Sequence, residues 1–379
     1  MNILINASNL KKGGGVQVGD SICRELNRFQ QHEFTVVLSS SMQDTYNEIK
    51  KMPNIAVCLY DLKNDWRTVL FGYDEFLDGV VKEKKIEAVL TIFGPSVWIP
   101  KCPHLCGFAR AQLIMPESPY YTQMNGYKLI INRLKYGIRE RAFKRCSNSF
   151  YTENPYTTER LAKKWSNKKV FTVTNYYNQV FDQPEKWREK KLVDFEGITL
   201  LTVTASYPHK NLGIAVEVAK VLRSKYPEFR FRFVITIDKD EYPANIHHVE
   251  DCFEFVGKVN IAECPSLYQQ CDIVFQPTLM ECFTASYPEA MRMERPIVTT
   301  DLEFAHKLCG EAAEYYSAVD ADACAEAIYK VATDGSLRER LKVQGKIQLE
   351  SFDNYNERAR KLIELTAGES RNLESTNII

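Results

Sequence analysis

Short apolar runs alternate with amphipathic segments along almost the whole chain. In the first half, the runs cover residues 2–7, 34–39, 54–60, 86–93, 104–109, 149–152 and 170–174. Between several of them, apolar residues recur at helical spacing, as in 16–28, 73–85 and 154–165. Buried strands that alternate with helices predict a parallel, doubly wound sheet.

The second half repeats this alternation after a break. Residues 176–196 have no clear periodicity and are rich in charged and amide side chains, which is typical of a connection between domains. Strands are then expected at 198–205, 231–237, 253–259, 272–278 and 296–300, with helices between and after them. The pattern predicts an α/β protein of two doubly wound, Rossmann-like domains that face a cleft.

The domain boundaries follow from these breaks. We expect an N-terminal domain over 1–180, a C-terminal domain over 181–352, a last helix over 353–367 and a disordered polar tail over 368–379.

One stretch carries the strongest chemical signal. Glu281 and Glu289 lie eight positions apart, after the strand 272–278 and where the next helix begins. Unpaired N–H groups at a helix N-terminus attract phosphate, and carboxylates accept hydrogen bonds from sugar hydroxyls. The stretch therefore predicts a site for a ligand with both sugar and phosphate. For Glu289 there is an alternative, because Ser286-x-x-Glu289 also has the form of a capping box.

A lysine is expected at the same edge of the second sheet. Lys210 follows the strand 198–205, in the loop that contains Ser206 and Asn211. An ammonium group there would neutralise a diphosphate leaving group. Taken alone, Lys210 is more simply explained as a surface lysine.

Two features of the first half allow two interpretations each. The loop that contains Gly14 and Gly15 brings backbone N–H groups close to a phosphate, or it is only a tight turn. Trp98 follows a strand end, where α/β sheets bind ligands, or it packs under the next strand.

Composition narrows the class of protein. The chain has 379 residues, of which 45% are hydrophobic and 26% charged, and it has no apolar run long enough to span a bilayer. The first residues lack the basic start and long apolar core of a signal peptide. The 11 cysteines are scattered singly, so reduced thiols are expected rather than zinc ligands. We expect a cytoplasmic protein without metal or cofactor and without a nucleic-acid partner.

Charge is unevenly distributed. Residues 1–180 contain 25 Lys and Arg against 16 Asp and Glu, whereas the remainder contains 24 against 33. Much of the positive charge falls in an expected amphipathic helix over 126–146. Such a helix can lie on an anionic membrane surface, or it can be a core-packed helix with a solvated basic face.

The Glu281–Glu289 stretch resembles the E-x7-E element of the GT4 family of retaining glycosyltransferases, which have the two-domain GT-B fold. The resemblance covers nearly the whole chain. It implies that Glu281 lies beside the donor sugar, that Glu289 binds the ribose, and that the amides of Phe283 and Thr284 hold the diphosphate.

Further positions are similar to the family pattern. Lys210 resembles the lysine of its basic pair, Gly257 its strand end near the nucleobase, and the loop with Gly14 and Gly15 its first glycine-rich loop. The final helix resembles one that crosses back onto the N-terminal domain. The family uses no metal.

Three positions depart from the family pattern. Cys282 and Thr284 replace two glycines of the loop, and Thr284 offers a hydroxyl group to phosphate. Ser206 stands where the family has an arginine, for which Arg110 on the acceptor side is a substitute. No histidine follows the strand that ends at Ala109.

The resemblance predicts a retaining glycosyltransferase. It would move a sugar from a nucleotide-diphosphate sugar to a lipid-linked saccharide in cell-surface polysaccharide synthesis, at the inner face of the cytoplasmic membrane. We assign Glu281 and Lys210 to catalysis, and Arg110 and Trp98 to the acceptor side. The alternatives are a sugar-phosphate synthase with a soluble acceptor and a non-catalytic protein that binds nucleotide sugars.

Overall fold

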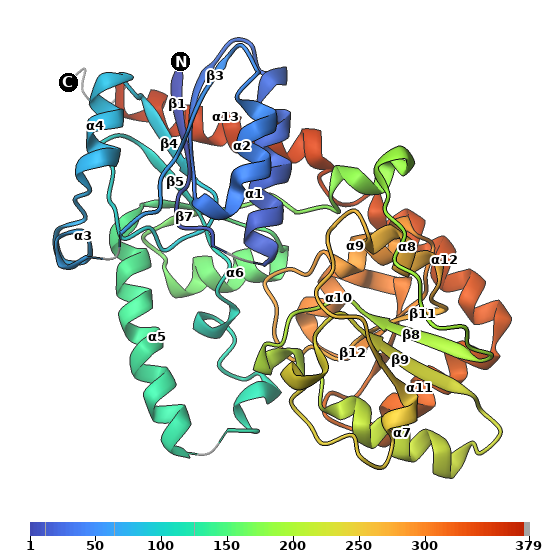
Figure 1. The fold of residues 1–379 in the computed structure, drawn as a ribbon. Coiled ribbons are helices and arrows are strands. Elements are labelled where there is room, and N and C mark those ends of the chain that lie inside the picture. Colours follow the sequence, from blue (N-terminus) through green and yellow to red (C-terminus); the bar gives the residue numbers. More distant parts are fainter. Residues whose placement is uncertain (12, 64, 125, 375–379) are drawn as a thin grey trace. The chain divides into compact units, whose positions relative to one another are not determined.

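The chain forms two compact units, each with its own sheet (Figure 1). The computed structural model describes residues 1–11, 13–63, 65–124 and 126–374. The first unit contains Met1–Ile114, Gly126–Asn175 and the chain from Asp353 onward, and the second contains Met115–Asn125 and Tyr176–Phe352.

The sheet of the first unit has the strand order β3-β2-β1-β4-β5-β6-β7, and all its pairs are parallel. The strands are β1 (Asn2–Ala7), β2 (Glu33–Leu38), β3 (Ile55–Leu59), β4 (Ala88–Thr91), β5 (His104–Gly107), β6 (Ser149–Thr152) and β7 (Lys169–Thr172). The order reverses between β1 and β4, so the loops after these two strands flank the switch point where doubly wound sheets bind ligands.

Alternate residues of the strands enter two different cores, because successive side chains of a strand point to opposite faces. Ile3 and Ile5 pack with residues of α1 (Gly14–Glu25), α2 (Gln43–Ile49) and α13 (Tyr355–Glu374). Leu4 instead packs with Leu77 of α4 (Glu75–Glu83). Because these strands are buried on both faces, they appear in the sequence as continuous apolar runs.

Trp98 belongs to the second of these cores. Its side chain is fully buried beside Leu4 and Leu77, and its indole N–H donates to Asp78 Oδ1 at 3.3 Å. The packing interpretation is therefore the right one, and the assignment of Trp98 to the acceptor side is corrected.

The remaining helices of the first unit are α3 (Trp66–Phe71), α5 (Gly126–Cys146) and α6 (Pro155–Lys164). The predicted helix over 126–146 is confirmed with the same bounds. Only Phe143 and Cys146 of α5 are buried, both in its last turn, so the helix has an anchored end and an exposed body.

The sheet of the second unit has the order β10-β9-β8-β11-β12-β13, again with parallel pairs. Its strands are β8 (Ile198–Thr202), β9 (Phe231–Ile235), β10 (Phe253–Phe255), β11 (Ile273–Gln276), β12 (Ile297–Thr300) and β13 (Ala313–Tyr316). Two parallel doubly wound sheets were predicted, and this fold class is confirmed.

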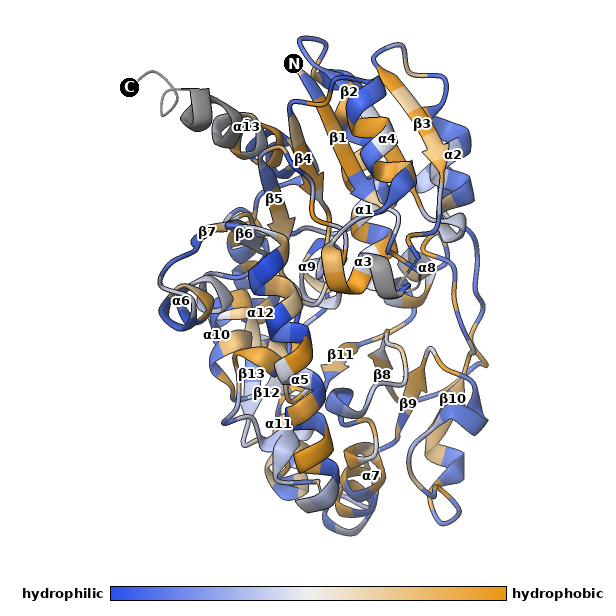
Figure 2. Ribbon diagram, turned by 90° about the vertical axis from the view of Figure 1, so that its left-hand side faces the viewer, coloured by the Kyte–Doolittle hydropathy of each residue, from blue (hydrophilic) through white to orange (hydrophobic). Residues whose placement is uncertain are grey.

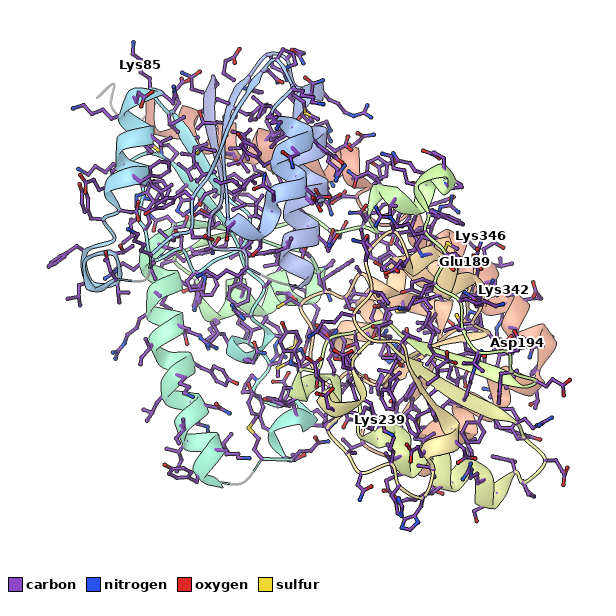
Figure 3. All side chains as sticks on the ribbon, in the orientation of Figure 1. Lys85, Glu189, Asp194, Lys239, Lys342 and Lys346 are labelled. Carbon is purple, nitrogen blue, oxygen red and sulfur yellow. The ribbon has the colours of Figure 1, made fainter. Side chains whose placement is uncertain are left out.

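Helices cover both faces of the second sheet. Apolar residues of α7 (Ile214–Lys225), α11 (Ala321–Thr333) and α12 (Gly335–Leu349) pack on one face with Leu200, Phe233 and Val298. The outer side chains Lys342 and Lys346 project from α12 away from the sheet (Figure 3). The unit also contains α8 (Cys264–Gln269), α9 (Ser286–Arg292) and α10 (Glu303–Cys309).

Apart from a boundary that lies after Asn175 rather than after residue 180, the division of the chain differs from the predicted domains in two places. Residues 115–125 were expected in the N-terminal domain but belong to the second unit. These residues belong to the second unit because side chains such as that of Ser118 form hydrogen bonds with it. The Ser118 hydroxyl group donates to the carbonyl of Leu279.

The second difference lies at the C-terminus. The last helix was expected to end at 367, before a disordered tail, but α13 continues to Glu374, so this prediction is wrong for 368–374. Residues 375–379 of the predicted tail lie outside the described residues.

Helix α13 is bonded to the first unit through one fully buried side chain. The Arg358 guanidinium donates to Ser21 Oγ at 2.6 Å and to Asn175 Oδ1. Burial raises the pKa of the nearby Glu153 to about 8, although the positive charge of Arg358 opposes this rise.

We expect Arg358→Ala to lower the free energy of unfolding by about 3 kcal/mol, because charge-assisted hydrogen bonds in a buried site are lost. The matched control is Arg360→Ala on the same helix, where an exposed side chain pairs with Glu357 and Glu364. Loss of such surface pairs costs about 1 kcal/mol or less. Urea unfolding of both variants tests this, and equal losses would contradict it.

Candidate functional site at the switch point of the second sheet

Strands β8 and β11 are neighbours in the second sheet, and the strand order reverses between them. The loop after β8 contains Lys210, and the loop after β11 contains Glu281. The carboxyl ends of parallel strands meet at one edge, so the topology brings together two residues that lie far apart in the sequence.

Lys210 and Glu281 form an ion pair at this edge. The distance from Lys210 Nζ to Glu281 Oε1 is 2.6 Å, and the two side chains are only 13% and 10% exposed. Thr278 Oγ1 donates to the same oxygen at 2.9 Å. A charge-assisted contact in such a shielded place is stronger than a surface pair and fixes both side chains.

The pair retains unused hydrogen-bonding capacity. Within the described part of the chain, Glu281 Oε2 accepts no hydrogen bond, and the Lys210 ammonium group contacts no acceptor besides Glu281. A carboxylate accepts through both oxygens, and an ammonium group has three donors. One oxygen and two N–H donors therefore remain for a ligand.

His209 flanks the pair. Its Nε2 lies 3.9 Å from Glu281 Oε1, and its ring stacks with Tyr207 at 5.7 Å between centroids. Burial lowers the pKa of His209, an effect that the charge of Lys210 adds to and that of Glu281 opposes, so the imidazole is held neutral at pH 7.

The loop between the two glutamates offers backbone donors. The N–H groups of Phe283, Thr284 and Ala285 bond to no other described residue. Helix α9, which follows, has seven residues and is capped by Ala285 without a side-chain bond. The donors are therefore the N–H groups of the loop itself rather than the end of a long helix.

The capping-box interpretation of Ser286 and Glu289 is wrong. Ser286 is the first residue of α9, and its hydroxyl group donates to the carbonyl of Val203 at 3.2 Å. Glu289 instead accepts a hydrogen bond from Tyr268 Oη at 2.8 Å. Burial raises the pKa of Glu289 to about 7, although the bond from Tyr268 opposes this rise.

The other predicted donor-binding residues of the second unit lie near the same sheet edge. Ser206 is exposed and donates to the carbonyl of Glu241 at 2.7 Å. Asn211 has a positive φ of 53° and a buried Nδ2 without a partner among the described residues. Gly257 has a φ of 69°, and a Cβ there would come within 2.9 Å of Asp238 Oδ1, so glycine is required.

The remaining predicted residues lie in the first unit. Gly14 and Gly15 begin α1, directly after Gly13 with its φ of 73°. A Cβ on Gly14 would meet no atom within 4 Å, so packing does not require glycine there. Arg110 is exposed at the carboxyl end of β5.

Three contributors to the site were not predicted from the sequence. Thr278 bonds directly to Glu281, and Tyr268 bonds to Glu289. His209, which was not among the predicted site residues, also lies beside Glu281. Thr278 precedes Glu281 by three positions, which was the only signal, whereas the contact of Tyr268 depends on the packing of α8 against α9.

Comparison with known proteins identifies the class. Residues 197–334 match the family model described as Glycosyl transferases group 1. The O-antigen chain mannosyltransferase RfbU of Salmonella typhimurium is 22% identical over 251 residues, which cover 64% of this chain and 67% of that protein.

Solved structures share the fold. A sucrose-phosphate synthase from Thermosynechococcus elongatus aligns over 99% of both chains, with a TM-score of 0.69 and 14% identity. The Anabaena protein HepE, solved in complex with UDP, aligns over 97% of this chain and all of that chain, with a TM-score of 0.68 and 12% identity.

The fold is therefore that of the GT-B glycosyltransferases, as predicted. The part of the second unit that matches the Glycosyl transferases group 1 model includes both Lys210 and Glu281. These two matches confirm the expectation that the chain is a glycosyltransferase.

The buried Glu289 gives a prediction for stability. Its raised pKa means that the folded chain keeps a proton that the unfolded chain releases above about pH 4.5. The free energy of unfolding should therefore fall as the pH rises from 4.5 to 7. Glu289→Gln has no carboxyl group to titrate at this position. Its free energy of unfolding, relative to that of the native chain, should therefore rise by on the order of 3 kcal/mol between pH 4.5 and pH 8.

Urea unfolding at pH 4.5 and pH 8 measures this difference. The control is Glu228→Gln, an exposed glutamate of the same unit, which should match the native chain at both pH values. A constant difference between Glu289→Gln and the native chain would show that the carboxyl group does not titrate in this range.

Proposed function

We propose that the chain is a retaining glycosyltransferase. The donor would be a nucleotide-diphosphate sugar, and the acceptor a lipid-linked saccharide used in cell-surface polysaccharide synthesis. The observation that carries the proposal is the shielded Lys210–Glu281 pair, with a spare carboxylate oxygen, spare ammonium donors and unpaired loop N–H groups at one sheet edge.

Each group of this site suits one part of a nucleotide-diphosphate sugar. The spare N–H donors of Lys210 and the N–H groups of Phe283 and Thr284 would bind the diphosphate, with the Thr284 hydroxyl group beside them. Glu281 Oε2 would accept a hydrogen bond from a sugar hydroxyl, and Glu289 one from the ribose. Gly257 and Asn211 would border the nucleotide.

The reaction needs one bond to break and one to form at the same face of the sugar. The bond between the anomeric carbon and the diphosphate oxygen breaks, and the acceptor oxygen attacks from the same side. The acceptor proton passes to the departing phosphate oxygen. Lys210 stabilises the negative charge that develops on the diphosphate, and Glu281 positions the sugar without forming a covalent bond to it.

Lys210→Met should lower kcat about 10²- to 10³-fold, the range for loss of one preorganised donor to a developing negative charge. Glu281→Gln should also lower kcat, because it weakens the contact with Lys210. The control is Lys239→Met, because Lys239, labelled in Figure 3, has a 59% exposed side chain paired with Glu250.

The assay measures transfer from UDP-, GDP-, TDP- and CDP-sugars, with and without EDTA. We expect no effect of EDTA, because Lys210 and the loop N–H groups would take the role of a metal. A rate of Lys210→Met close to that of the control would contradict the assignment of the site.

The acceptor proposal rests on α5. Tyr127, Ile130, Leu134 and Ile138 are 60–75% exposed, and at 3.6 residues per turn they form one apolar stripe. Figure 2 shows hydrophobic and hydrophilic positions interleaved along this helix. Basic residues surround the stripe, namely Lys128, Arg133, Lys135, Arg139 and Arg141. An exposed apolar stripe with basic neighbours suits the surface of an anionic bilayer.

The second exposed apolar group lies on α3. Val69, Leu70 and Phe71 are 44–69% exposed, and Arg145 of α5 donates to the carbonyl of Leu70 at 2.8 Å. The two helices are thus joined. No helix in the described ranges is long and apolar enough to cross a membrane. We propose that α5 and α3 contact the inner face of the cytoplasmic membrane peripherally.

Replacing Ile130, Leu134 and Ile138 by Ser should release the chain from vesicles that contain anionic lipid. Changing Arg139, Arg141 and Lys144 to Gln should weaken binding roughly 10²-fold, since each basic residue near an anionic surface contributes about 1 kcal/mol. The control is the Ser variant of Val343 and Ile347, which are exposed apolar residues of α12. Unchanged sedimentation of the α5 variants with vesicles would contradict membrane contact.

A soluble acceptor would give a different set of results. Transfer to a sugar phosphate without binding to vesicles would favour a synthase, the activity named for the structural neighbour from Thermosynechococcus elongatus. Binding of a nucleotide sugar without turnover would favour a non-catalytic protein.

A further inference from the structure

Residues 115–124 come from the first half of the sequence but belong to the second unit. The residues before and after this segment, up to Ile114 and from Gly126, belong to the first unit. Inside the segment, Ser118 is buried and its Oγ donates to the carbonyl of Leu279 at 2.7 Å. The segment is therefore bonded to the loop that carries Glu281.

Both backbone polar groups of Leu279 form hydrogen bonds. Its carbonyl accepts from Ser118, and its N–H donates to the carbonyl of His209 at 2.8 Å. His209 immediately precedes Lys210, and Thr278, which precedes Leu279, donates to Glu281 Oε1. One buried residue thus joins the segment to both loops that carry the ion pair.

Aromatic contacts reinforce this arrangement. The ring of Tyr120 meets that of His209 edge-on, at 6.3 Å between centroids and 90° between planes. Tyr207 stacks on the same ring. Gln123 adds a longer contact, from its Nε2 to Asn211 Oδ1 at 3.4 Å. The segment therefore contacts the Lys210 loop at His209 and at Asn211.

We propose that residues 115–124 are a positioning segment for the Lys210–Glu281 pair, with Ser118 as its principal residue. The proposal rests on the proposed function of that pair. Ser118 does not contact Lys210 or Glu281 itself; it acts through Leu279. Without its hydrogen bond, the Leu279 carbonyl is left unpaired in a buried site, and the loop shifts to find another donor.

The first test is kinetic. Ser118→Ala should lower kcat for sugar transfer about tenfold, while it should reduce the stabilisation by the donor nucleoside diphosphate less than Lys210→Met does. Ser118→Thr keeps the hydroxyl group and should restore kcat to within about twofold of the native value. The matched control is Thr122→Ala, because Thr122 is exposed in the same segment and its hydroxyl group donates to Pro119.

Two kinetic results would overturn the proposal. One is a kcat for Ser118→Ala close to that of Thr122→Ala. The other is a parallel loss of kcat, nucleotide binding and melting temperature, which would make Ser118 a structural residue of the whole unit.

A second measurement does not depend on turnover. Amide hydrogen exchange over residues 277–283 should be faster in Ser118→Ala than in Thr122→Ala, and slow again in Ser118→Thr. Equal exchange in all three variants would overturn the proposal. If the native chain transfers no sugar, the proposed function fails, and the exchange result still decides whether the segment holds the loop.

Discussion

The candidate site depends on one interaction, the contact between the Lys210 ammonium and the Glu281 carboxylate. Both side chains are nearly buried, so each charge has lost much of its hydration. The attraction between two such charges is largely offset by that loss, and the pair adds little to stability. Its effect is on position: a lysine with a long flexible stem is held in one place, with donors still free for a ligand.

The order of the strands makes this contact reachable. Because β8 and β11 are adjacent and parallel, their loops leave the sheet at the same edge, although Lys210 and Glu281 are about seventy positions apart. The peptide groups of the two loops are then joined directly, through the bond from Leu279 to His209. The sheet determines where the loops begin, and this bond determines how they face each other.

Much of this could be predicted from the sequence, because buried parallel strands appear as continuous apolar runs. The two sheets and the proximity of Lys210 to Glu281 followed from that pattern, and α5 followed from its amphipathic spacing. Trp98 could not be placed, because a tryptophan after a strand suits either a core or a ligand site. The contacts of Tyr268 and Ser118 depend on packing between distant segments, and no local pattern records them. The capping box at Ser286 failed because α9 begins at Ser286 itself, one residue earlier than the pattern requires.

The most direct test of the account is thermal stabilisation by nucleoside diphosphates. A ligand that binds only the folded chain raises stability by RT ln(1 + [L]/Kd), so a hundredfold excess over Kd adds about 2.7 kcal/mol. We expect one of UDP, GDP, TDP and CDP to raise the melting temperature of the native chain, and Lys210→Met to lose most of that rise. If none of the four nucleotides shifts the melting temperature, the Lys210–Glu281 pair is not a donor site.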